Sequence, residues 1–312
     1  MPTFMNPPAE AAFDNRATLP LCRPRGTLGN AAPFRRVQNC GQPQTSSWTS
    51  LIAMAAPQPM LGVSARRWPE GGRRVLQPKW DGFRLLVDVG AGGEVRGWSR
   101  QGADLTARLG SLLAPFADVA PGTTFDGELV AVGERDGQPV QDFAAVTRAV
   151  FTGRPIAADR LQFVAFDLIA AAGHDLRPRP WEERDARLRE TLPPCDRIRV
   201  VASQPATLAG HEAIVALGFE GTVLKRQEAA YRAGRHRAWL KHKARLIARA
   251  ELRSVHRDHD GCWHALCDID GRRVHARAGA RTGERVGQIV DLVYSRVDAD
   301  GSLREARVAP TS

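Results

Sequence analysis

The sequence predicts an α+β fold in which antiparallel sheets with flanking helices precede a small β-barrel of the OB type. Short runs of alternating hydrophobic and polar residues recur along most of the chain and are typical of half-buried strands. A few longer segments repeat hydrophobic residues at helical spacing. From about residue 247, five short alternating runs follow one another closely, which suits a small barrel.

Length and composition favour a globular protein with an anionic partner. The 312 residues suffice for two domains, and a formal charge of +10 with a pI near 10.2 favours nucleic acid over a membrane surface. The five cysteines are scattered, which indicates a reducing interior rather than a disulfide framework. No window approaches the roughly 18 to 20 apolar residues of a membrane span, so we expect a soluble, cytoplasmic protein.

The first 55 residues are rich in Pro, Asn, Gln, Ser and Thr and show no sustained hydrophobic period. Such a composition predicts a disordered N-terminal extension. We expect one domain over residues 56–246 and the barrel domain over residues 247–312.

Period-two alternation predicts the strands of the first domain. Residues 75–79 run into a turn at Asp81 and Gly82, and residues 83–89 then alternate, so Lys79 is expected at a strand end beside a tight turn. The glycine-rich residues 90–93 predict the next hairpin. Further strands are expected over residues 94–100, 124–132, 161–169, 221–226 and 238–243.

Helical spacing predicts four helices. Residues 105–116 place five apolar side chains on one side, and residues 141–149 and 181–192 also show helical patterns. The segment 207–217 is expected to end at Gly218, a residue type favoured at helix C-termini. In the barrel region, Asp-Gly turns separate runs over residues 250–256, 263–269, 273–278, 286–294 and 303–308.

Lysine usage singles out a few positions. The 44 basic residues include only four lysines, and these are Lys79, Lys225, Lys241 and Lys243. Guanidinium stays protonated and cannot serve as an amine nucleophile, whereas a lysine amine can lose its proton when its pKa is depressed. The retained lysines therefore indicate tasks for which Arg is unsuited, although chance survival is the alternative for any one of them.

Lys79 is the candidate nucleophile, with a phosphate as the electrophile. Burial beside Trp80 and the cationic neighbours Arg84, Lys241 and Lys243 would lower its pKa. The two-residue spacing of Lys241 and Lys243 on a strand places both on one face, where they would stabilise the charge of a phosphoryl group.

Three further side chains suit a nucleotide pocket. Glu128 and Glu220 are candidates for binding Mg²⁺ or sugar hydroxyls, because Mg²⁺ takes one or two carboxylates together with phosphate oxygens. Phe166 would offer a stacking face to a base. Each also has a plainer interpretation: solvated strand residues for the two carboxylates, and core packing for Phe166.

Taken in order, these residues resemble the motifs of the covalent nucleotidyltransferases, most closely the small two-domain bacterial ATP-dependent DNA ligases. The resemblance covers about residues 56–246 well and the remainder loosely. The matching motifs are Lys79 with Asp81, Gly82 and Arg84; Ser99, Arg100 and Gly102; Asp126, Gly127 and Glu128; Phe166, Asp167 and Leu168; Glu220 to Lys225; and Trp239 to Lys243.

The resemblance implies an adenylation domain followed by an OB domain, with ATP and Mg²⁺ as cofactors. It implies that Lys79 takes AMP from ATP, that AMP passes to the 5′-phosphate of a DNA nick, and that the 3′-hydroxyl then displaces AMP. The implied site roles are ribose contacts for Arg84 and Glu128, adenine stacking for Phe166, metal binding for Glu220 and Glu128, α-phosphate contacts for Lys241 and Lys243, and nucleotide or nick-phosphate contacts for Arg100 and Arg235.

The implied setting is DNA repair, recombination or replication. The resemblance suggests a monomer associated with the bacterial nucleoid, nicked double-stranded DNA as substrate, and repair proteins such as a polymerase or an end-binding protein as possible partners. The basic surface would make DNA binding weaken steeply with salt.

Two positions depart from the family pattern. Gln77 stands where related ligases usually have a Glu that contacts adenine, and an amide can donate and accept but carries no charge. Residues 304–312 hold no counterpart of the family's sixth motif, so we expect an OB domain truncated at its C-terminus. An RNA ligase, a capping-type guanylyltransferase, and a catalytically impaired nick-binding or end-binding protein remain the alternatives.

Overall fold

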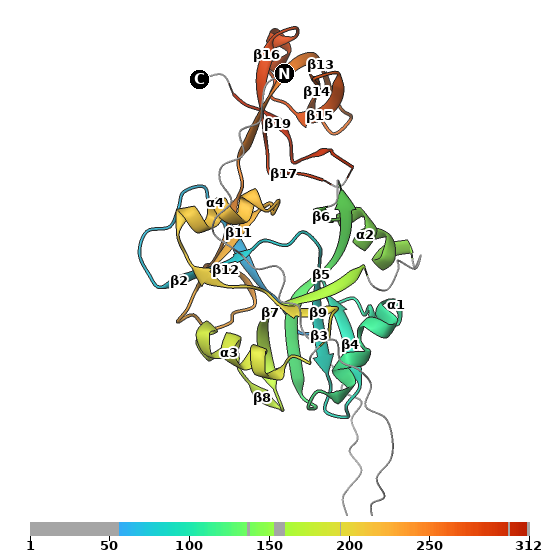
Figure 1. The fold of residues 1–312 in the computed structure, drawn as a ribbon, viewed down its shortest axis with the longest axis vertical. Coiled ribbons are helices and arrows are strands. Elements are labelled where there is room, and N and C mark those ends of the chain that lie inside the picture. The colour runs from blue at the N-terminus through green and yellow to red at the C-terminus, as the bar shows by residue number, and fades with distance from the viewer. Residues whose placement is uncertain (1–55, 136–137, 153–159, 194, 299, 311–312) are drawn as a thin grey trace, which may run out of the picture. The chain divides into compact units, whose positions relative to one another are not determined.

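The computed structural model describes residues 56–135, 138–152, 160–193, 195–298 and 300–310 (Figure 1). The predicted fold class is confirmed, since two mainly antiparallel sheets with a few helices accompany a closed five-stranded barrel. The predicted disorder of residues 1–55 lies outside the described residues, and the domain boundaries at residues 55 and 246 stay a prediction. No helix in the described ranges has the length and apolar composition needed to span a bilayer.

The larger sheet supplies one half of the candidate site. Its order is β4 (Val95–Ser99), β3 (Phe83–Val89), β5 (Thr123–Arg135), β7 (Leu161–Ala171) and β8 (His174–Asp175), with β6 (Gln138–Gln141) paired to β5 and β9 (Ile198–Val200) paired to β7. One face of this sheet covers the main hydrophobic core, where the rings of Phe116, Phe125 and Phe163 pack together. Burial on this scale makes the sheet a rigid support for the polar side chains that it carries.

The smaller sheet supplies the other half. Its order is β1 (Met60–Ser64), β12 (Gly234–Lys243), β11 (Gly221–Arg226), β2 (Arg74–Pro78) and β10 (Gln204–Pro205). Strand register aligns Gln77, Val223 and Lys241 in one row and Leu76, Leu224 and Leu240 in the next. Because adjacent rows of a sheet point to opposite faces, the polar row and the leucine row serve different sides. The leucine row packs under α4 (Leu208–Ala216) through Ile214.

The helices agree with the sequence except at residues 105–116. α2 (Phe143–Thr152), α3 (Trp181–Thr191) and α4 lie close to the predicted segments, and Gly218 adopts a φ of 87° after α4. The prediction of one helix over residues 105–116 was wrong. The chain forms α1 (Thr106–Leu109) and the 3₁₀ helices η1 (Gly110–Leu112) and η2 (Ala114–Asp118), because Gly110 has a φ of 48° and the helix breaks there. All five apolar side chains that define the predicted face are nevertheless buried.

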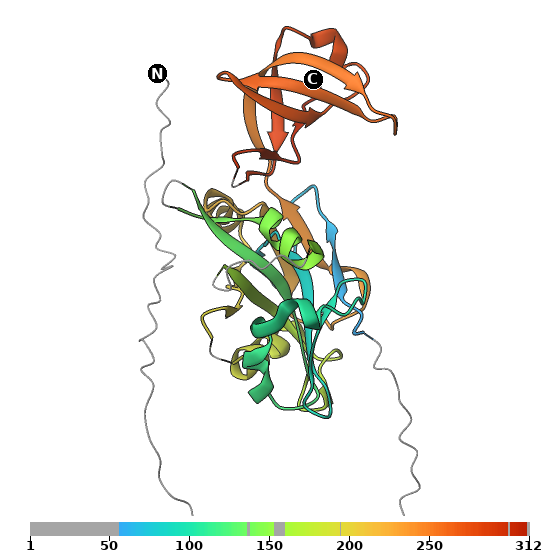
Figure 2. The same cartoon turned by 90° about the vertical axis from the view of Figure 1, so that its right-hand side faces the viewer.

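The C-terminal strands close into the predicted barrel, visible in Figure 2 as the orange and red segment. Its members are β13 (Leu246–Arg257), β14 (Trp263–Ile269), β15 (Arg272–Arg277), β19 (Arg307–Val308) and β16 (Ile289–Tyr294), and the 3₁₀ helix η3 (Thr282–Arg285) precedes β16. The strand predicted over residues 303–308 is divided. Its first part, β18 (Leu303–Arg304), pairs with β17 (Arg296–Val297), and Glu305 interrupts it with a φ of 55°.

Candidate active site

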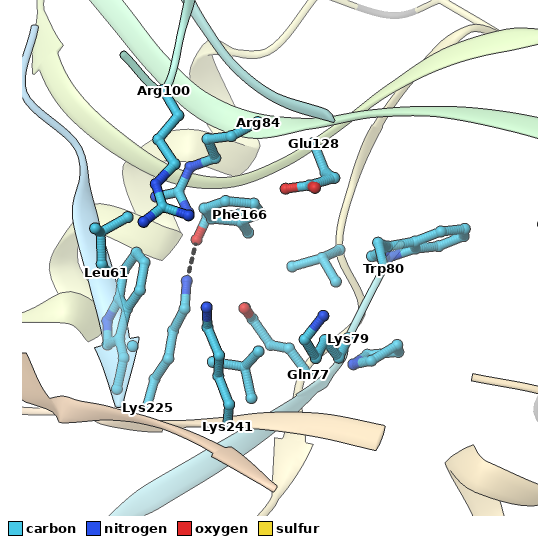
Figure 3. Close-up of a pocket in the computed structure, with 15 residues that line it drawn as sticks. Leu61, Gln77, Lys79, Trp80, Arg84, Arg100, Glu128, Phe166, Lys225 and Lys241 are labelled. Atoms are coloured by element: carbon cyan, nitrogen blue, oxygen red, sulfur yellow. Dashed lines mark hydrogen bonds between the residues drawn. The ribbon is translucent and has the colours of Figure 1, made fainter. Parts of the chain in front are cut away.

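A pocket of about 140 Å³ is lined by strands of both sheets (Figure 3). The structure brings together seven of the ten predicted site residues in its lining: Gln77, Lys79, Arg84, Arg100, Glu128, Phe166 and Lys241. Residues from the polar row of the smaller sheet face residues carried by β3, β5 and β7. The shared pocket results from strand order, which places segments far apart in the sequence on neighbouring strands.

Lys79 directly follows β2, and its backbone N–H donates a hydrogen bond of 2.9 Å to the carbonyl oxygen of Gly221 at the start of β11. This bond continues the β2–β11 ladder by one residue, so the side chain leaves from the rigid end of a strand. The Nζ atom forms an ion pair with the carboxylate of Glu220. The nucleophile candidate therefore has a fixed origin and a defined partner.

Two opposing effects set the proton affinity of Lys79. Burial lowers its pKa to about 8, and the positive charges of Lys241 and Lys243 act in the same direction. The negative charges of Glu128 and Asp81 favour the protonated amine, as does the ion pair with Glu220. A metal ion that bound these carboxylates would weaken their hold on the proton and leave an amine that loses it more readily.

The turn after Lys79 approaches β5 too closely for any side chain. A Cβ atom at Gly82 would lie 2.2 Å from the carbonyl oxygen of Leu129 and 2.9 Å from the side chain of Glu128. Only glycine permits this approach. The turn therefore holds Lys79 and Glu128 in the same small volume.

Two carboxylates flank the amine. Burial raises the pKa of Glu128 to about 7, although Arg84 and Lys79 oppose the shift. Glu220 is buried and lies just before β11, in a bend rather than in the strand that the sequence suggested. Two carboxylates beside a cationic phosphate site match the ligand preference of Mg²⁺, which binds one or two carboxylates and completes its shell with phosphate oxygens and water.

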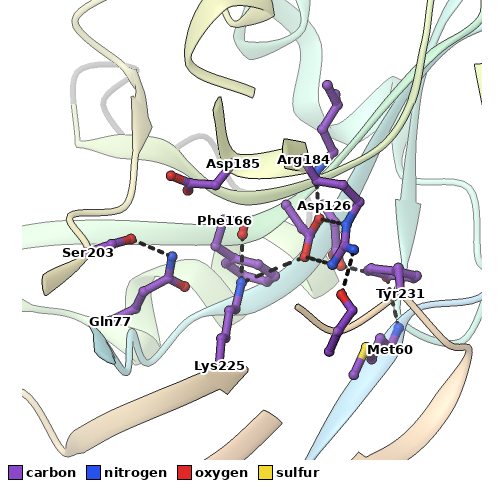
Figure 4. A network of polar contacts seen from close by, with 12 residues as sticks. Met60, Gln77, Asp126, Phe166, Arg184, Asp185, Ser203, Lys225 and Tyr231 are labelled. Carbon is purple, nitrogen blue, oxygen red and sulfur yellow. Dashed lines mark hydrogen bonds and ion pairs between the residues drawn. The ribbon is translucent and has the colours of Figure 1, made fainter. Parts of the chain in front are cut away.

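Arg84 is held by a buried polar network that includes Asp126, Met60 and Tyr231, which are labelled in Figure 4. Its Nε and Nη2 atoms each donate a 2.6 Å hydrogen bond to the carboxylate of Asp126, and Nη2 also donates to the Met60 carbonyl oxygen at 2.9 Å. The hydroxyl of Tyr231 donates to Asp126 at 2.6 Å. Asp126 raises the pKa of Arg84 against the effect of burial. The guanidinium is thus permanently charged and fixed 4.5 Å from the centre of the Phe166 ring.

Lys225 lines the pocket, although the sequence motifs predicted no specific role for it. Its Nζ donates a 2.6 Å hydrogen bond to the carbonyl oxygen of Phe166 and lies 3.9 Å from Asp167, which Arg184 also contacts. Burial lowers the pKa of Lys225 to about 8. Figure 3 shows its side chain rising beside Lys241 into the same cavity. The signal available in the sequence was its membership in the small set of retained lysines.

Aromatic rings form one wall of the pocket. Phe166 and Trp239 meet edge to face with centroids 5.9 Å apart, and both line the cavity. Gln77 is buried nearby and donates from Nε2 to the Ser203 hydroxyl at 2.9 Å, which leaves its carbonyl oxygen to accept a further bond. Apolar rings with a fixed amide suit recognition of a flat heterocycle.

Three predicted residues stand outside the lining. Glu220 lies beside the pocket as the ion-pair partner of Lys79. Lys243 pairs with Glu305 at the β18–β19 junction, although it shares a strand face with Lys241. Arg235 is exposed near the start of β12, and its charge helps lower the pKa of Lys241. The direct roles proposed for these residues stay predictions.

The turn residue Asp81 is also engaged. Its carboxylate accepts a hydrogen bond of 2.6 Å from Nη2 of Arg296 and forms an ion pair with Nη2 of Arg304 at 3.1 Å. Both arginines belong to the β17–β18 hairpin, whose pairing holds them side by side. Arg296 also pairs with Asp298. The edge of the pocket is therefore tied to the last part of the described chain.

Comparison with known proteins places this geometry in a family. A family model described as an ATP dependent DNA ligase domain matches residues 59–243, more than half of the chain. A probable DNA ligase of Streptomyces griseus is 38% identical over 204 residues, covering 60% of this chain and 39% of the relative. A multifunctional non-homologous end joining protein LigD of Pseudomonas aeruginosa is 33% identical over 222 residues, covering 69% and 24%. The chain thus spans between about a quarter and two fifths of the length of these curated relatives.

Solved structures share the fold. The ligase domain of Mycobacterium tuberculosis LigD superposes with a TM-score of 0.51 at 24% identity, covering 82% of this chain and 95% of that domain. A Lig E DNA ligase, described as binding DNA with a minimal scaffold, gives a TM-score of 0.59 at 19% identity and covers 82% and 100%. At these identities the likeness concerns the arrangement of sheets and barrel.

Proposed function

Because the chain belongs to the ATP-dependent DNA ligase family, we propose that it seals nicks in double-stranded DNA through an AMP group carried on Lys79. The observation that carries this proposal is the environment of one amine. Lys79 is a lysine with a pKa lowered to about 8, placed between two carboxylates and beside Lys241 in a pocket with an aromatic wall. Such an amine suits attack on a phosphate better than an ordinary surface lysine does.

The proposed reaction has three displacements at phosphorus. The neutral amine of Lys79 attacks the α-phosphate of ATP, a P–N bond forms, and the bond to pyrophosphate breaks. The 5′-phosphate of the nick then attacks the same phosphorus and releases the amine. Finally the 3′-hydroxyl attacks the DNA phosphate, so that a phosphodiester forms and AMP leaves.

Side chains of the pocket fit the binding part of this proposal. Lys241, Lys225 and Arg100 supply positive charge for phosphates, and Phe166 with Trp239 supplies a surface for adenine. Gln77 would accept a hydrogen bond from the adenine amino group. Glu128 and Glu220 would hold Mg²⁺, which would offset charge on the phosphate oxygens. Arg100 and Arg235 would contact the nucleotide or the nick phosphate.

The names of the relatives support a repair setting. Some are probable DNA ligases and others are non-homologous end joining proteins, so we propose nicked duplex DNA as the substrate and end-joining proteins as partners. The charge of +10 supports binding to DNA. Action as a monomer in the cytoplasm, on DNA of the nucleoid, belongs to the same proposal.

Intact-mass measurement of the full chain tests the first step. Incubation with ATP and Mg²⁺ should add one AMP to wild type and none to Lys79→Arg, which keeps the charge but lacks a titratable amine. GTP in place of ATP should add nothing. Label from GTP alone would instead support a capping-type guanylyltransferase, and no label together with salt-sensitive DNA binding would support a nick-binding protein without turnover. Sealing of pre-adenylylated nicked DNA then tests the last step separately.

A further inference from the structure

A second cavity, of about 470 Å³, opens on the other side of the smaller sheet. Its lining includes Arg74 on β2 and Leu240 on β12, whereas the candidate active site includes Gln77 on β2 and Lys241 on β12. The ladder aligns Leu240 with Leu76 and Lys241 with Gln77, so the two cavities belong to opposite faces of one sheet. This second cavity is therefore separate from the pocket around Lys79.

Positive charge dominates the second cavity. Four arginines line it, Arg66, Arg67, Arg74 and Arg237, and the described lining contains no Asp or Glu. Within the described part of the chain, no carboxylate lies within ion-pair distance of these four guanidinium groups. Arginine presents a planar set of donors that matches phosphate oxygens. A surface on which positive charge outweighs nearby negative charge favours the binding of an anion.

Arg74 adds a second, independent observation. Its Nε and Nη1 atoms are buried and have no hydrogen-bond partner among the described residues. Arg226 lies directly opposite on β11, and burial together with repulsion by this second guanidinium lowers the pKa of Arg74, although the charge of Glu228 opposes the shift. Buried donors without partners are rare because each forfeits its hydrogen bonds to water. An anion bound in the cavity would remove that cost.

The loop that forms one wall is anchored by aromatic packing. Trp68 contacts the ring of His242 at 5.3 Å, edge to face, and the ring of His211 at 5.9 Å. The Ala65 N–H donates to the Lys241 carbonyl oxygen at 2.9 Å, which ties the start of the loop to β12. Arg66 and Arg67 are thus carried by a loop fixed at both sides, so little order would have to be created on binding.

We propose that this arginine-lined cavity binds phosphate groups, carried either by a DNA strand or by a free polyphosphate. The surface would be a second anion site, on the face turned away from Lys79, and it would add contacts to those of the candidate active site. It would take no part in the reaction at Lys79. Its effect would appear in the affinity for phosphate-bearing ligands and in the dependence of that affinity on salt concentration.

The test compares charge-matched double variants of the full chain. Arg74→Gln with Arg237→Gln removes two guanidinium groups from the cavity. Arg148→Gln with Arg179→Gln removes two exposed guanidinium groups on α2 and before α3, outside both cavities. Arg237→Gln alone, at an exposed position, keeps the test valid if the change at the partly buried Arg74 lowers the melting temperature.

Two measurements distinguish the sources of phosphate. For unnicked duplex DNA, the slope of log affinity against log salt should fall by about 2 in the cavity double variant and by about 1 in Arg237→Gln, because each lost phosphate contact reduces it by about 0.9. Calorimetry with inorganic tripolyphosphate should count one site fewer in the cavity variant than in the control.

A changed DNA slope identifies a DNA strand as the ligand. An unchanged slope with a lost tripolyphosphate site identifies a free polyphosphate. If neither changes, or if the control behaves like the cavity variant, the proposal is wrong.

Discussion

At the scale of single residues, the proposed chemistry depends on the protonation of Lys79. Burial and neighbouring cations lower its pKa, while the carboxylates of Glu220 and Glu128 favour the charged form. The same carboxylates are the candidate ligands for Mg²⁺, so metal binding and deprotonation of the amine would support one another. This coupling explains why a lysine suits the position and an arginine does not.

The rate of AMP transfer to Lys79 should therefore depend on pH in a defined way. With a pKa of about 8, the neutral fraction grows about tenfold per pH unit below pH 8 and then levels off. Rapid-quench measurement of AMP attachment from pH 6 to 10 checks this. Sealing of pre-adenylylated nicked DNA is the control, because that step does not use the neutral amine. A rate that keeps rising about tenfold per unit up to pH 10, as the ordinary lysine pKa of 10.5 would give, would contradict the environment described for Lys79.

The buried carboxylate of Glu128 should lower the stability of the folded chain while it supports AMP attachment. Burial raises its pKa to about 7 from an ordinary value of 4.5, so the folded chain binds more protons than the unfolded chain between these pH values. The free energy of unfolding contributed by this group must fall as pH rises from about 4.5 to 7. Glu128→Gln removes the penalty and should stabilise the protein at pH 8 by roughly 2 kcal/mol, allowing for screening at a partly exposed carboxyl, while AMP attachment is lost. Urea unfolding at pH 5 and pH 8 measures the difference, and equal effects at both pH values would contradict the assigned cause.

At the scale of elements, strand register explains why so much of the site was predictable. Period-two alternation located β2, β3, β5 and β11, and motif residues at fixed positions on those strands then had to meet once the strands paired. Lys241 and His242 illustrate the rule, since one lines the pocket and the other packs against Trp68.

Other features depend on long-range pairing that local patterns do not reveal. β1 was missed because residues 60–64 hold Gly62 and a ladder irregularity instead of clean alternation, and their parallel partner β12 lies about 170 residues away. The pairing of Lys243 with Glu305 and the network around Asp126 and Tyr231 likewise join distant segments. Lys225 carries a motif position, but only the fold shows that it enters the pocket.

The turn between β2 and β3 gives a prediction at this scale. Gly82→Ala should destabilise the fold by about 2 kcal/mol or more, because its Cβ would overlap the Leu129 carbonyl oxygen and displace the turn that carries Lys79. Gly283→Ala is the matched control, since nothing lies within 4 Å of a Cβ there and the backbone needs no left-handed conformation. Thermal unfolding compares the two. A Gly82→Ala protein as stable as the control would show that the turn tolerates a side chain.

At the scale of the whole described chain, one ion pair joins segments 215 residues apart, the pocket turn at Asp81 and the β17–β18 hairpin at Arg296. Both side chains are largely buried, with 3% exposure at Arg296 and 12% at Asp81. Removing one partner of a buried pair typically costs about 3 to 5 kcal/mol, and here Arg304 beside Asp81 and Asp298 beside Arg296 compensate part of the remaining charge. The exposed pair of Lys243 and Glu305 provides the contrast, because such pairs contribute less than about 1 kcal/mol.

A double-mutant cycle over Asp81→Asn and Arg296→Gln should therefore show strong coupling, with the double variant more stable than the sum of the single effects predicts. A parallel cycle over Lys243→Gln and Glu305→Gln should show coupling below about 1 kcal/mol. Urea unfolding followed by tryptophan fluorescence gives the free energies, since Trp80 lines the pocket beside this turn. If the Asp81–Arg296 contact forms only in part of the population, its coupling will be as small as that of the exposed pair. Strong coupling would mean that a substitution or displacement in the β17–β18 hairpin alters the position of the turn that carries Lys79, because a buried charge pair joins the two segments.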